Sequence, residues 1–304
     1  MKTTVVKRRK FKYQDLPSLI IETYKAWSAN NPFRLSAVIA YYAILSLPAL
    51  LVIIINVVGA IWGPEIVQGQ LTQEFSSALG KDAADAIQTM IAETQNKESS
   101  TISTIIGLGT LLFGATGVFY QLQISLNEIW EIQPNPKASI WKVVVDRARS
   151  FAFILVIGFL LLVSFIVTAG ISALNGYIRR LFPEIILYLA YVLDLVLSIG
   201  IITTLFALMF RYLPDVKIRW KTVWIGAFIT ALLFVLGKSL LGFYFGEANP
   251  GSTYGAAGTV VLILLWVSYS CLILFFGAEF TWVYAKRYGI DITPSEIGAK
   301  NDKK

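Results

Sequence analysis

Histidine is absent from this chain of 304 residues, and cysteine occurs once, as Cys271. The absence of histidine excludes histidine-based acid–base catalysis and any nucleophile that depends on a histidine base. A zinc site built from histidine and cysteine is excluded as well. An intrachain disulfide needs two cysteines, so it is also excluded. Cys271 lies in an apolar run, where we expect it to be a small buried hydrophobic side chain.

Charged residues are scarce. They make up 15% of the chain, whereas soluble domains carry about 25%. Hydrophobic residues make up 56%, and the mean hydropathy is +0.65. This balance is typical of a membrane protein.

Long apolar segments account for most of the hydrophobic residues. There are six, at 35–61, 102–124, 149–174, 184–210, 222–246 and 256–284. Each exceeds the roughly 20 residues that a helix needs to cross a bilayer, and each is too long for a barrel strand. Because the backbone must be hydrogen-bonded inside lipid, helices remain. The sequence predicts an all-α polytopic membrane protein with six transmembrane helices, the third and fourth joined by a short hairpin.

The first 34 residues form a separate unit. Residues 1–13 are basic, and no short apolar run with a small-residue cleavage site follows, so we expect no cleaved signal peptide. Residues 14–30 place Leu16, Leu19, Ile20, Tyr24 and Trp27 on one helical stripe. This pattern predicts an N-terminal amphipathic helix in the membrane interface.

The loops predict the orientation. Together, 21 Lys and Arg residues lie in the N-terminal unit, the loop between the second and third apolar segments, the loop between the fourth and fifth, and the C-terminal tail. The remaining loops hold 4. By the positive-inside rule both termini are cytoplasmic, in a bacterial cytoplasmic membrane. The basic N-terminus is then expected to contact anionic lipid headgroups rather than nucleic acid.

The loop at 63–101 is the one large exterior segment that we predict. It holds six acidic residues and two lysines, with apolar residues at helical spacing. We expect two short amphipathic helices over the outer mouth of the bundle. The membrane domain then spans 35–286, and a cytoplasmic tail spans 287–304.

Two opposite charges lie inside the apolar segments. Lys238 is about 12 Å from the outer end of its segment and Asp194 about 15 Å from the same face, at 1.5 Å per residue. Each alone would cost at least about 2.5–3.5 kcal/mol at a helix centre, so we hypothesise that they pair. The pair is either a transport site or a structural contact that fixes helix register, and the sequence leaves both open.

Further polar residues lie near the cytoplasmic ends of the segments. Arg211 and Glu279 are close enough in depth to pair. Gln121, Ser125 and Glu128 recur at helical spacing, which indicates one polar face near Gln123 and Asn127. The alternative is ordinary interface chemistry, with Trp130 as the aromatic anchor.

Glycine and proline mark positions for helix packing or bending. These are Pro48, Gly107, Gly109, Gly114, Gly117, Gly255 and Gly258. Small residues allow close packing of helices in lipid, and a locally unwound helix near Gly114 is the alternative. Pro48 is expected to kink the first helix.

Several motifs resemble one known family. AYYAILSLPALLVI, SLNEIW, RYLPDVKIRW and FGAEF occur in this order, and the likeness covers about residues 20–290. The chain resembles the YihY/BrkB family of bacterial inner-membrane proteins. The resemblance implies six helices, and it matches recurrent family residues to Lys238, Arg211 and Glu279. Members have carried ribonuclease, virulence and serum-resistance labels, and a link to envelope lipid transport has been suggested.

Three functions can be weighed. A transporter or flippase of an amphiphilic or anionic envelope molecule would use Lys238 and Asp194, with Gln121, Asn127, Glu128, Arg211 and Glu279 contributing. A scaffold or regulator of an envelope complex would not need a midplane ion pair. A ribonuclease would need clustered carboxylates or histidines around metal ions, and the cytoplasmic carboxylates are scattered. We therefore favour a transporter, and expect neither catalysis nor a cofactor.

Overall fold

The computed structural model describes residues 13–79, 84–85, 87–89, 91–92, 117–134, 145, 148, 152, 156, 183–248, 257–290, 292–294 and 298–300. The long elements are helices, as predicted. They are α1 (Leu16–Ala29, after a 3-10 turn at Tyr13–Asp15), α2 (Pro32–Trp62), α3 (Pro64–Leu79), an unlabelled helix at 117–129, α7 (Pro183–Tyr212), α8 (Trp220–Ala248) and α9 (Gly258–Arg287). Four short strands, β1 to β4, accompany them: Ile132–Pro134, Val216–Lys217, Thr293–Pro294 and Gly298–Lys300.

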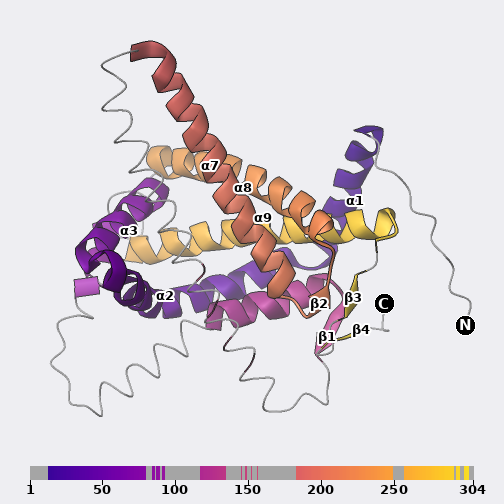
Figure 1. Ribbon diagram of the computed structural model, residues 1–304. Helices are drawn as coiled ribbons and strands as arrows, with labels where there is room; N and C mark the ends of the chain where they lie inside the picture. The colour runs from indigo at the N-terminus through magenta and orange to yellow at the C-terminus, as the bar shows by residue number, and fades with distance from the viewer. Residues whose placement is uncertain are drawn as a thin grey trace, which may run out of the picture.

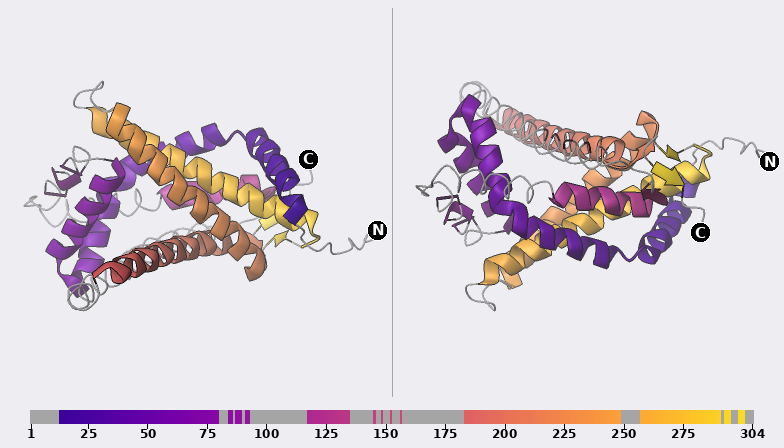
Figure 2. Two further views of the ribbon diagram at one scale, coloured as in Figure 1. Left: turned by 90° about the horizontal axis from the view of Figure 1, so that it is seen from above. Right: turned by 90° about the horizontal axis from the view of Figure 1, so that it is seen from below.

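Helix α9 is central to the arrangement. It packs against α1, α2 and α8, and α8 packs in turn against α7. Helix α8 crosses α9, and α7 and α8 diverge from their shared hairpin (Figure 2). All four strands, α1 and the C-terminal end of α9 lie at one end of the molecule, and α3 lies at the other (Figure 1). We call these the terminal end and the α3 end.

Three described helices are long and apolar enough to cross a membrane, at Leu195–Tyr212, Trp220–Phe245 and Gly258–Arg287. They correspond to the last three predicted spans. The first predicted span, 35–61, falls on α2. Its part Pro32–Leu47 counts as a shorter apolar helix, and α2 continues through Pro48. Of the second, only the part from residue 117 is described, and the third lies almost wholly outside the described residues. The count of six therefore stays a prediction.

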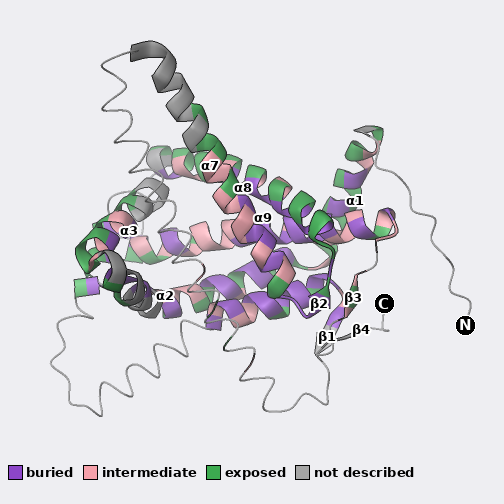
Figure 3. Ribbon diagram, viewed as in Figure 1, coloured by how far each residue is buried: buried purple, intermediate pink, exposed green. Residues whose placement is uncertain are grey.

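Burial inside the molecule is partial in the spanning helices. Within the apolar 18-residue window of each span, between 28% and 33% of the residues are buried, and exposed positions run along α7 and α8 (Figure 3). On α8 the exposed side chains include Leu236 at 64%, Leu240 at 65% and Phe243 at 71%. A soluble protein rarely exposes so large an apolar surface, and bilayer lipid would cover it.

Helices α8 and α9 meet through a reciprocal pair of glycines and threonines. Gly226 of α8 faces Thr281 of α9, and Gly277 of α9 faces Thr230 of α8, so closely that a methyl group on either glycine would overlap the threonine. Each threonine hydroxyl donates to the carbonyl of the glycine one turn earlier on its own helix, at 2.7 Å. Small residues and satisfied hydroxyls let the two backbones approach closely.

The N-terminal helix is present, but only part of its predicted stripe faces the protein. Leu19 is fully buried and Trp27 packs against the core, whereas Leu16, Ile20 and Tyr24 are 41% to 57% exposed. The helix ends at Ala29 with Asn30 as its C-cap, and Asn31 takes a left-handed conformation (φ 49°) that asparagine tolerates. Its placement in the membrane interface stays a prediction.

The C-terminal tail is tied to the terminal end. Helix α9 ends at Arg287 and is followed by Gly289 in the left-handed region (φ 62°), and the N–H of Ile290 donates to the carbonyl of Ala285 at 2.9 Å, as in a Schellman motif. Strand β3 then pairs antiparallel with β2, and β4 with β1. The tail thus joins the α7–α8 hairpin to the segment after helix 117–129.

The predicted packing glycines and the predicted exterior loop are described only in part, and their roles stay predictions. Gly117 is the first described residue of the helix at 117–129, Gly258 is the first residue of α9, and both are buried. Gly107, Gly109, Gly114 and Gly255 lie outside the described residues. In the predicted exterior loop, α3 is a helix and the described residues between 84 and 92 are helical.

Candidate functional site

Six polar or aromatic residues bring four segments together near the terminal end. We call them the polar layer, and they are Asn30, Gln123, Asn127, Trp130, Asp215 and Glu279. They come from the α1–α2 turn, the helix at 117–129, the α7–α8 hairpin and α9. The layer therefore links four segments that are distant in sequence.

Asp215 is the carboxylate of the hairpin and is 2% exposed. Asn127 donates from Nδ2 to its Oδ2 at 3.1 Å, and Gln123 donates from Nε2 to its Oδ1 at 3.3 Å. The backbone N–H of Asp215 donates back to Oδ1 of Asn127 at 2.8 Å. Residues 123 and 127 are about one helical turn apart and share a face, which is why both reach one carboxylate.

Glu279 is the second buried carboxylate, at 1% exposed. Asn30 donates from Nδ2 to its Oε1. One residue earlier on α9, the carbonyl of Ala278 accepts a hydrogen bond from Trp130 Nε1 at 3.0 Å. Neighbouring residues on α9 therefore bind the α1–α2 turn and the helix at 117–129.

Trp130 was the aromatic anchor in the alternative interpretation, ordinary chemistry at the membrane interface. The structure does not favour that alternative, because Trp130 is fully buried and its ring centroid lies 6.1 Å from that of Phe210. Its indole N–H needs a partner when buried, and the Ala278 carbonyl supplies one.

The predicted polar face on the helix at 117–129 divides into different surroundings. Gln123 and Asn127 are buried with Asp215, whereas Glu128 is exposed and pairs with Arg34 at 2.6 Å. Ser125 is fully buried, and its hydroxyl is without a hydrogen-bond partner. Gln121 is half-buried and makes no contact with the polar layer among the described hydrogen bonds. Residues at helical spacing share a face only approximately, and packing decides which of them meets a partner.

Arg211 and Glu279 do not pair with each other, contrary to the prediction. Arg211 donates to the carbonyl of Ile218 and lies 5.6 Å from the Trp220 ring centroid. The hairpin after α7 folds back on Arg211, so the guanidinium finds a carbonyl and an aromatic face within its own hairpin. Glu279 meets Asn30 instead.

Lys238 lies on α8 with an exposed side chain. Asp194 lies on α7, which packs against α8, but its side chain is outside the described residues. Their pairing stays a prediction.

The geometry limits what the polar layer does chemically. Amide donors reach both oxygens of Asp215, so this carboxylate joins a helix to a hairpin rather than presenting an open oxygen to a ligand. Within the described residues, no group of three or more Asp, Glu, Cys or His could hold a metal ion. The layer therefore holds elements together by hydrogen bonds.

Sequence reasoning missed Asn30 and treated Asp215 as one scattered carboxylate. The Asn30–Asn31 pair is a turn signal, but nothing in the sequence relates it to a glutamate 249 positions later. Gln123 and Asn127 lie four residues apart, a spacing that could have drawn attention to this face.

The comparisons with known proteins agree with the resemblance found in the motifs. The family model described as Virulence factor BrkB matches residues 23–300. A UPF0761 membrane protein of Haemophilus influenzae is 25% identical over 84% of this chain and 91% of its own length. One of Aeromonas salmonicida is 26% identical over 84% of this chain and 86% of its own length.

A third relative, a UPF0761 membrane protein of Verminephrobacter eiseniae, is 28% identical over 58% of this chain, which covers 40% of that protein. No solved structure matches the chain. Because the family model spans most of the sequence, from the N-terminal helix through the C-terminal tail, the chain belongs to the Virulence factor BrkB family of membrane proteins.

Proposed function

We propose that this membrane protein is a transporter or flippase for an anionic amphiphile of the cell envelope, and that it is not an enzyme. The observation that carries the proposal is Lys238. It is exposed within the apolar span Trp220–Phe245, on a helix whose Leu236 and Leu240 are exposed as well. An ammonium group on an apolar surface can attract the anionic group of a molecule whose chains lie against the leucines.

Asp194 is proposed as the counter-charge. It lies 18 residues before Tyr212, the end of α7, and Lys238 lies 18 residues after Trp220, the start of α8. At 1.5 Å per residue, each is about 27 Å along its helix from the shared hairpin. The two positions therefore match in level along the two helices. Because α7 and α8 diverge from the hairpin, an exchange of Lys238 between Asp194 and an anionic substrate requires the two helices to approach each other at this level (Figure 2).

The polar layer is proposed to hold the terminal end closed in this conformation. Moving the α7–α8 hairpin away from the helix at 117–129 would break the bonds between Asp215 and Asn127. Glu279 and Asn30 would hold α9 to the α1–α2 turn in the same way. Transport would then require these contacts to open and re-form.

We also propose that the terminal end is cytoplasmic, in a bacterial inner membrane. The described segments that carry most of the basic residues, including Arg34, Arg219, Lys286 and Arg287, belong to that end (Figure 1). The exposed apolar residues of α1 and the basic arm before it support contact with anionic lipid headgroups there.

Lipid movement in proteoliposomes tests the proposal. The purified protein is reconstituted with phosphatidylglycerol labelled on its headgroup, and a membrane-impermeant quencher reports how fast label reaches the outer leaflet. We expect faster movement than in protein-free vesicles, a loss of at least tenfold with Lys238→Gln, and retention with Lys238→Arg. Lys221→Gln is the matched control, because it removes a charge from the start of the same helix.

Cysteine accessibility separates transport from a scaffold role. In a Cys271→Ser background, single cysteines at 190, 194, 234 and 238 are treated with a small water-soluble thiol reagent. Reaction at 194 or 238 is expected if a water-filled path reaches this level. If none of the four positions reacts, even in permeabilised membranes, and lipid movement stays at the protein-free rate, the transport proposal is wrong and a scaffold role is favoured.

A further inference from the structure

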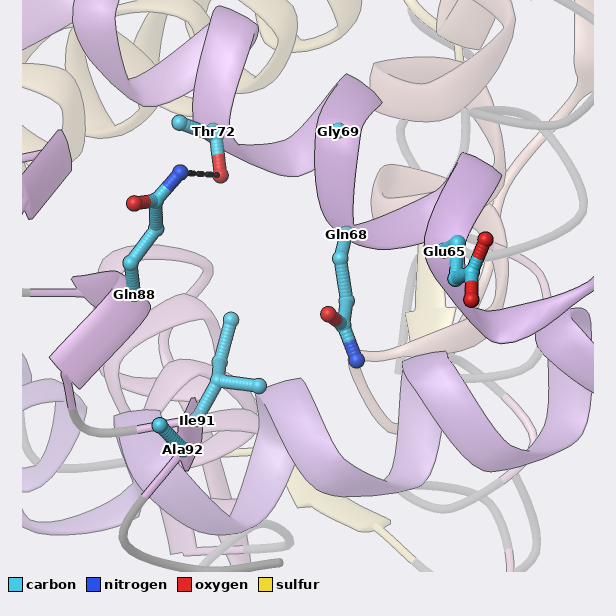
Figure 4. Close-up of a pocket in the computed structure, with 7 residues that line it drawn as sticks. All are labelled: Glu65, Gln68, Gly69, Thr72, Gln88, Ile91 and Ala92. Carbon is cyan, nitrogen blue, oxygen red and sulfur yellow. Dashed lines mark hydrogen bonds between the residues drawn. The ribbon is translucent and has the colours of Figure 1, made fainter.

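A pocket of about 340 Å³ lies at the α3 end of the molecule. It opens between α3 and the helical residues near 84–92. Figure 4 shows Gln68 and Thr72 on α3 on one side and Gln88 and Ile91 on the other. Its volume falls at the lower limit for small-molecule sites, which suits a ligand of one ring rather than a chain.

Three of the polar side chains that line this pocket can both donate and accept hydrogen bonds. Gln68 and Gln88 each offer an amide donor and an amide acceptor, and Thr72 offers a hydroxyl that does both. Glu65 adds a carboxylate acceptor at the rim, and Ile91, only 5% exposed, supplies an apolar floor. Groups that donate and accept at once match ligand hydroxyls, which do the same.

One hydrogen bond already crosses the pocket. Gln88 Nε2 donates to Thr72 Oγ1 at 3.3 Å, at the long end of the range for such bonds (Figure 4). A ligand hydroxyl placed between the two side chains could accept from Gln88 and donate to Thr72, so binding would replace a weak contact with two. The cost of entry is therefore small.

The negative charge of Glu65 disfavours an anionic ligand in this pocket. Glu65 is the one ionisable residue among the described residues that line the pocket, and residues 63–101 hold six acidic residues against two lysines. The Glu65 carboxylate would repel a phosphate or carboxylate, because none of the described lining residues is a cation that would compensate its charge. A neutral ligand rich in hydroxyls avoids this repulsion.

We propose that this pocket binds a single neutral sugar ring. The proposal goes beyond the transport function and does not depend on it, since the pocket and Lys238 lie on different elements and Lys238 does not line the pocket. In the orientation proposed above, the pocket faces the exterior, where the sugar units of envelope polymers are within reach.

Saturation-transfer NMR on the full chain in nanodiscs tests the site, with N-acetylglucosamine as the probe at millimolar concentration. We expect transfer to the sugar ring protons with the wild-type protein. Thr72→Val keeps the side-chain shape and removes the hydroxyl, and Gln88→Leu removes the amide on the opposite wall. Each is expected to weaken binding about fivefold to tenfold, as the loss of one or two neutral hydrogen bonds predicts.

Gln73→Leu is the matched control, because Gln73 is exposed on α3 and does not line the pocket. It should bind the sugar like wild type, and equal thermal unfolding of all three variants would show that folding is intact. Glucose 6-phosphate serves as an anionic comparison ligand and putrescine as a cationic one. N-acetylglucosamine should bind more tightly than either. Absence of transfer with the wild type, equal binding by all variants, or preference for the phosphate or the diamine would overturn the proposal.

Discussion

Asn127 and Asp215 exchange two hydrogen bonds, and this exchange shows how a few buried polar residues act in a chain with few charges. The side-chain amide serves as donor to a carboxylate and as acceptor from the same residue's backbone. A buried carboxylate without such donors would be costly, and so would an unpaired backbone N–H. The contact therefore fixes the α7–α8 hairpin against the helix at 117–129.

Asn127→Leu should destabilise the protein, because it removes two hydrogen bonds. The Asp215 carboxylate loses the donor Asn127 Nδ2, and the backbone N–H of Asp215 loses the acceptor Asn127 Oδ1. We expect the free energy of unfolding to fall by about 1–3 kcal/mol. Denaturant unfolding of the purified protein in detergent measures this. Gln121→Leu is the control on the same helix, and equal losses in the two variants would contradict a specific role for Asn127.

Tyr288 provides a pH-dependent contact at the terminal end. Its hydroxyl donates to Asp15 Oδ2 at 3.1 Å, and Arg287 lies 3.7 Å from the same carboxylate. Burial, followed by the hydrogen bond to the Asp15 carboxylate and its charge, raises the pKa of Tyr288 above its ordinary value of 10.0. All three causes favour the neutral phenol in the folded protein.

The contribution of Tyr288 to stability should therefore be complete below about pH 10 and be lost as the pH rises through the raised pKa. Unfolding of wild type and Tyr288→Phe, compared from about pH 8 to pH 11, measures the difference. The wild type should be the more stable protein at pH 8, and the gap should close in alkali. A gap that stays constant over this range would contradict the assignment.

At the scale of elements, the α8–α9 contact depends on the absence of two side chains. Gly226 and Gly277 leave room for Thr281 and Thr230, whose hydroxyls are held by bonds within their own helices. A methyl group would overlap the threonine, and the packed helices would have to separate. Cores respond to such overpacking with losses of about 1–3 kcal/mol.

Gly226→Ala and Gly277→Ala should therefore each lower the thermal stability in detergent, despite the better helix propensity of alanine. Gly242→Ala is the matched control on α8, since no atom outside its own helix backbone and chain neighbours lies within 4 Å of an added methyl group. It should be neutral or stabilising by up to about 1 kcal/mol. If all three substitutions behave alike, close packing at the crossing is not the reason for the glycines.

The two short strand pairs give the tail a testable register. Lys217 and Thr293 are opposite residues in the β2–β3 pair, and Cα atoms of such pairs are separated by about 4.5–5.5 Å, within disulfide range. In a Cys271→Ser background, cysteines at 217 and 293 should form a disulfide on mild oxidation, detected as protection from a thiol-reactive polymer. Cysteines at 217 and 300 are the control, because Lys300 is opposite Ile132 instead. Equal oxidation of both pairs would contradict the register.

At the scale of the whole molecule, the two ends differ in charge and in what they carry. The terminal end holds the four strands, α1 and the α7–α8 hairpin, and the α3 end holds α3 (Figure 1). Single cysteines at 221 and 73, both exposed positions, report on the two ends. An impermeant thiol reagent on intact cells should label position 73 alone and label both after permeabilisation. Labelling of position 221 in intact cells would reverse the proposed orientation.

The helical class, the last three spans and the family could be predicted because each depends on local or linear features. An apolar run of sufficient length predicts a spanning helix without knowledge of its neighbours. The candidate site could be predicted only in part. Asn127 and Glu279 were marked as polar residues at one depth, but their partners, Asp215 and Asn30, come from a hairpin and a turn that are distant in sequence.

The sequence by itself determined that the chain is helical, that it enters a membrane and that Lys238 lies in an apolar run. These properties follow from composition, the length of apolar runs and the order of motifs. All three are features of the linear sequence and do not depend on which residues are neighbours in space. Only the tertiary structure decided that Arg211 turns to its own hairpin, that Trp130 is buried and that the tail pairs with two loops. Those outcomes depend on which polar group lies nearest to a side chain once the helices have packed. The spacing of residues in the sequence does not give the distance between side chains of different elements.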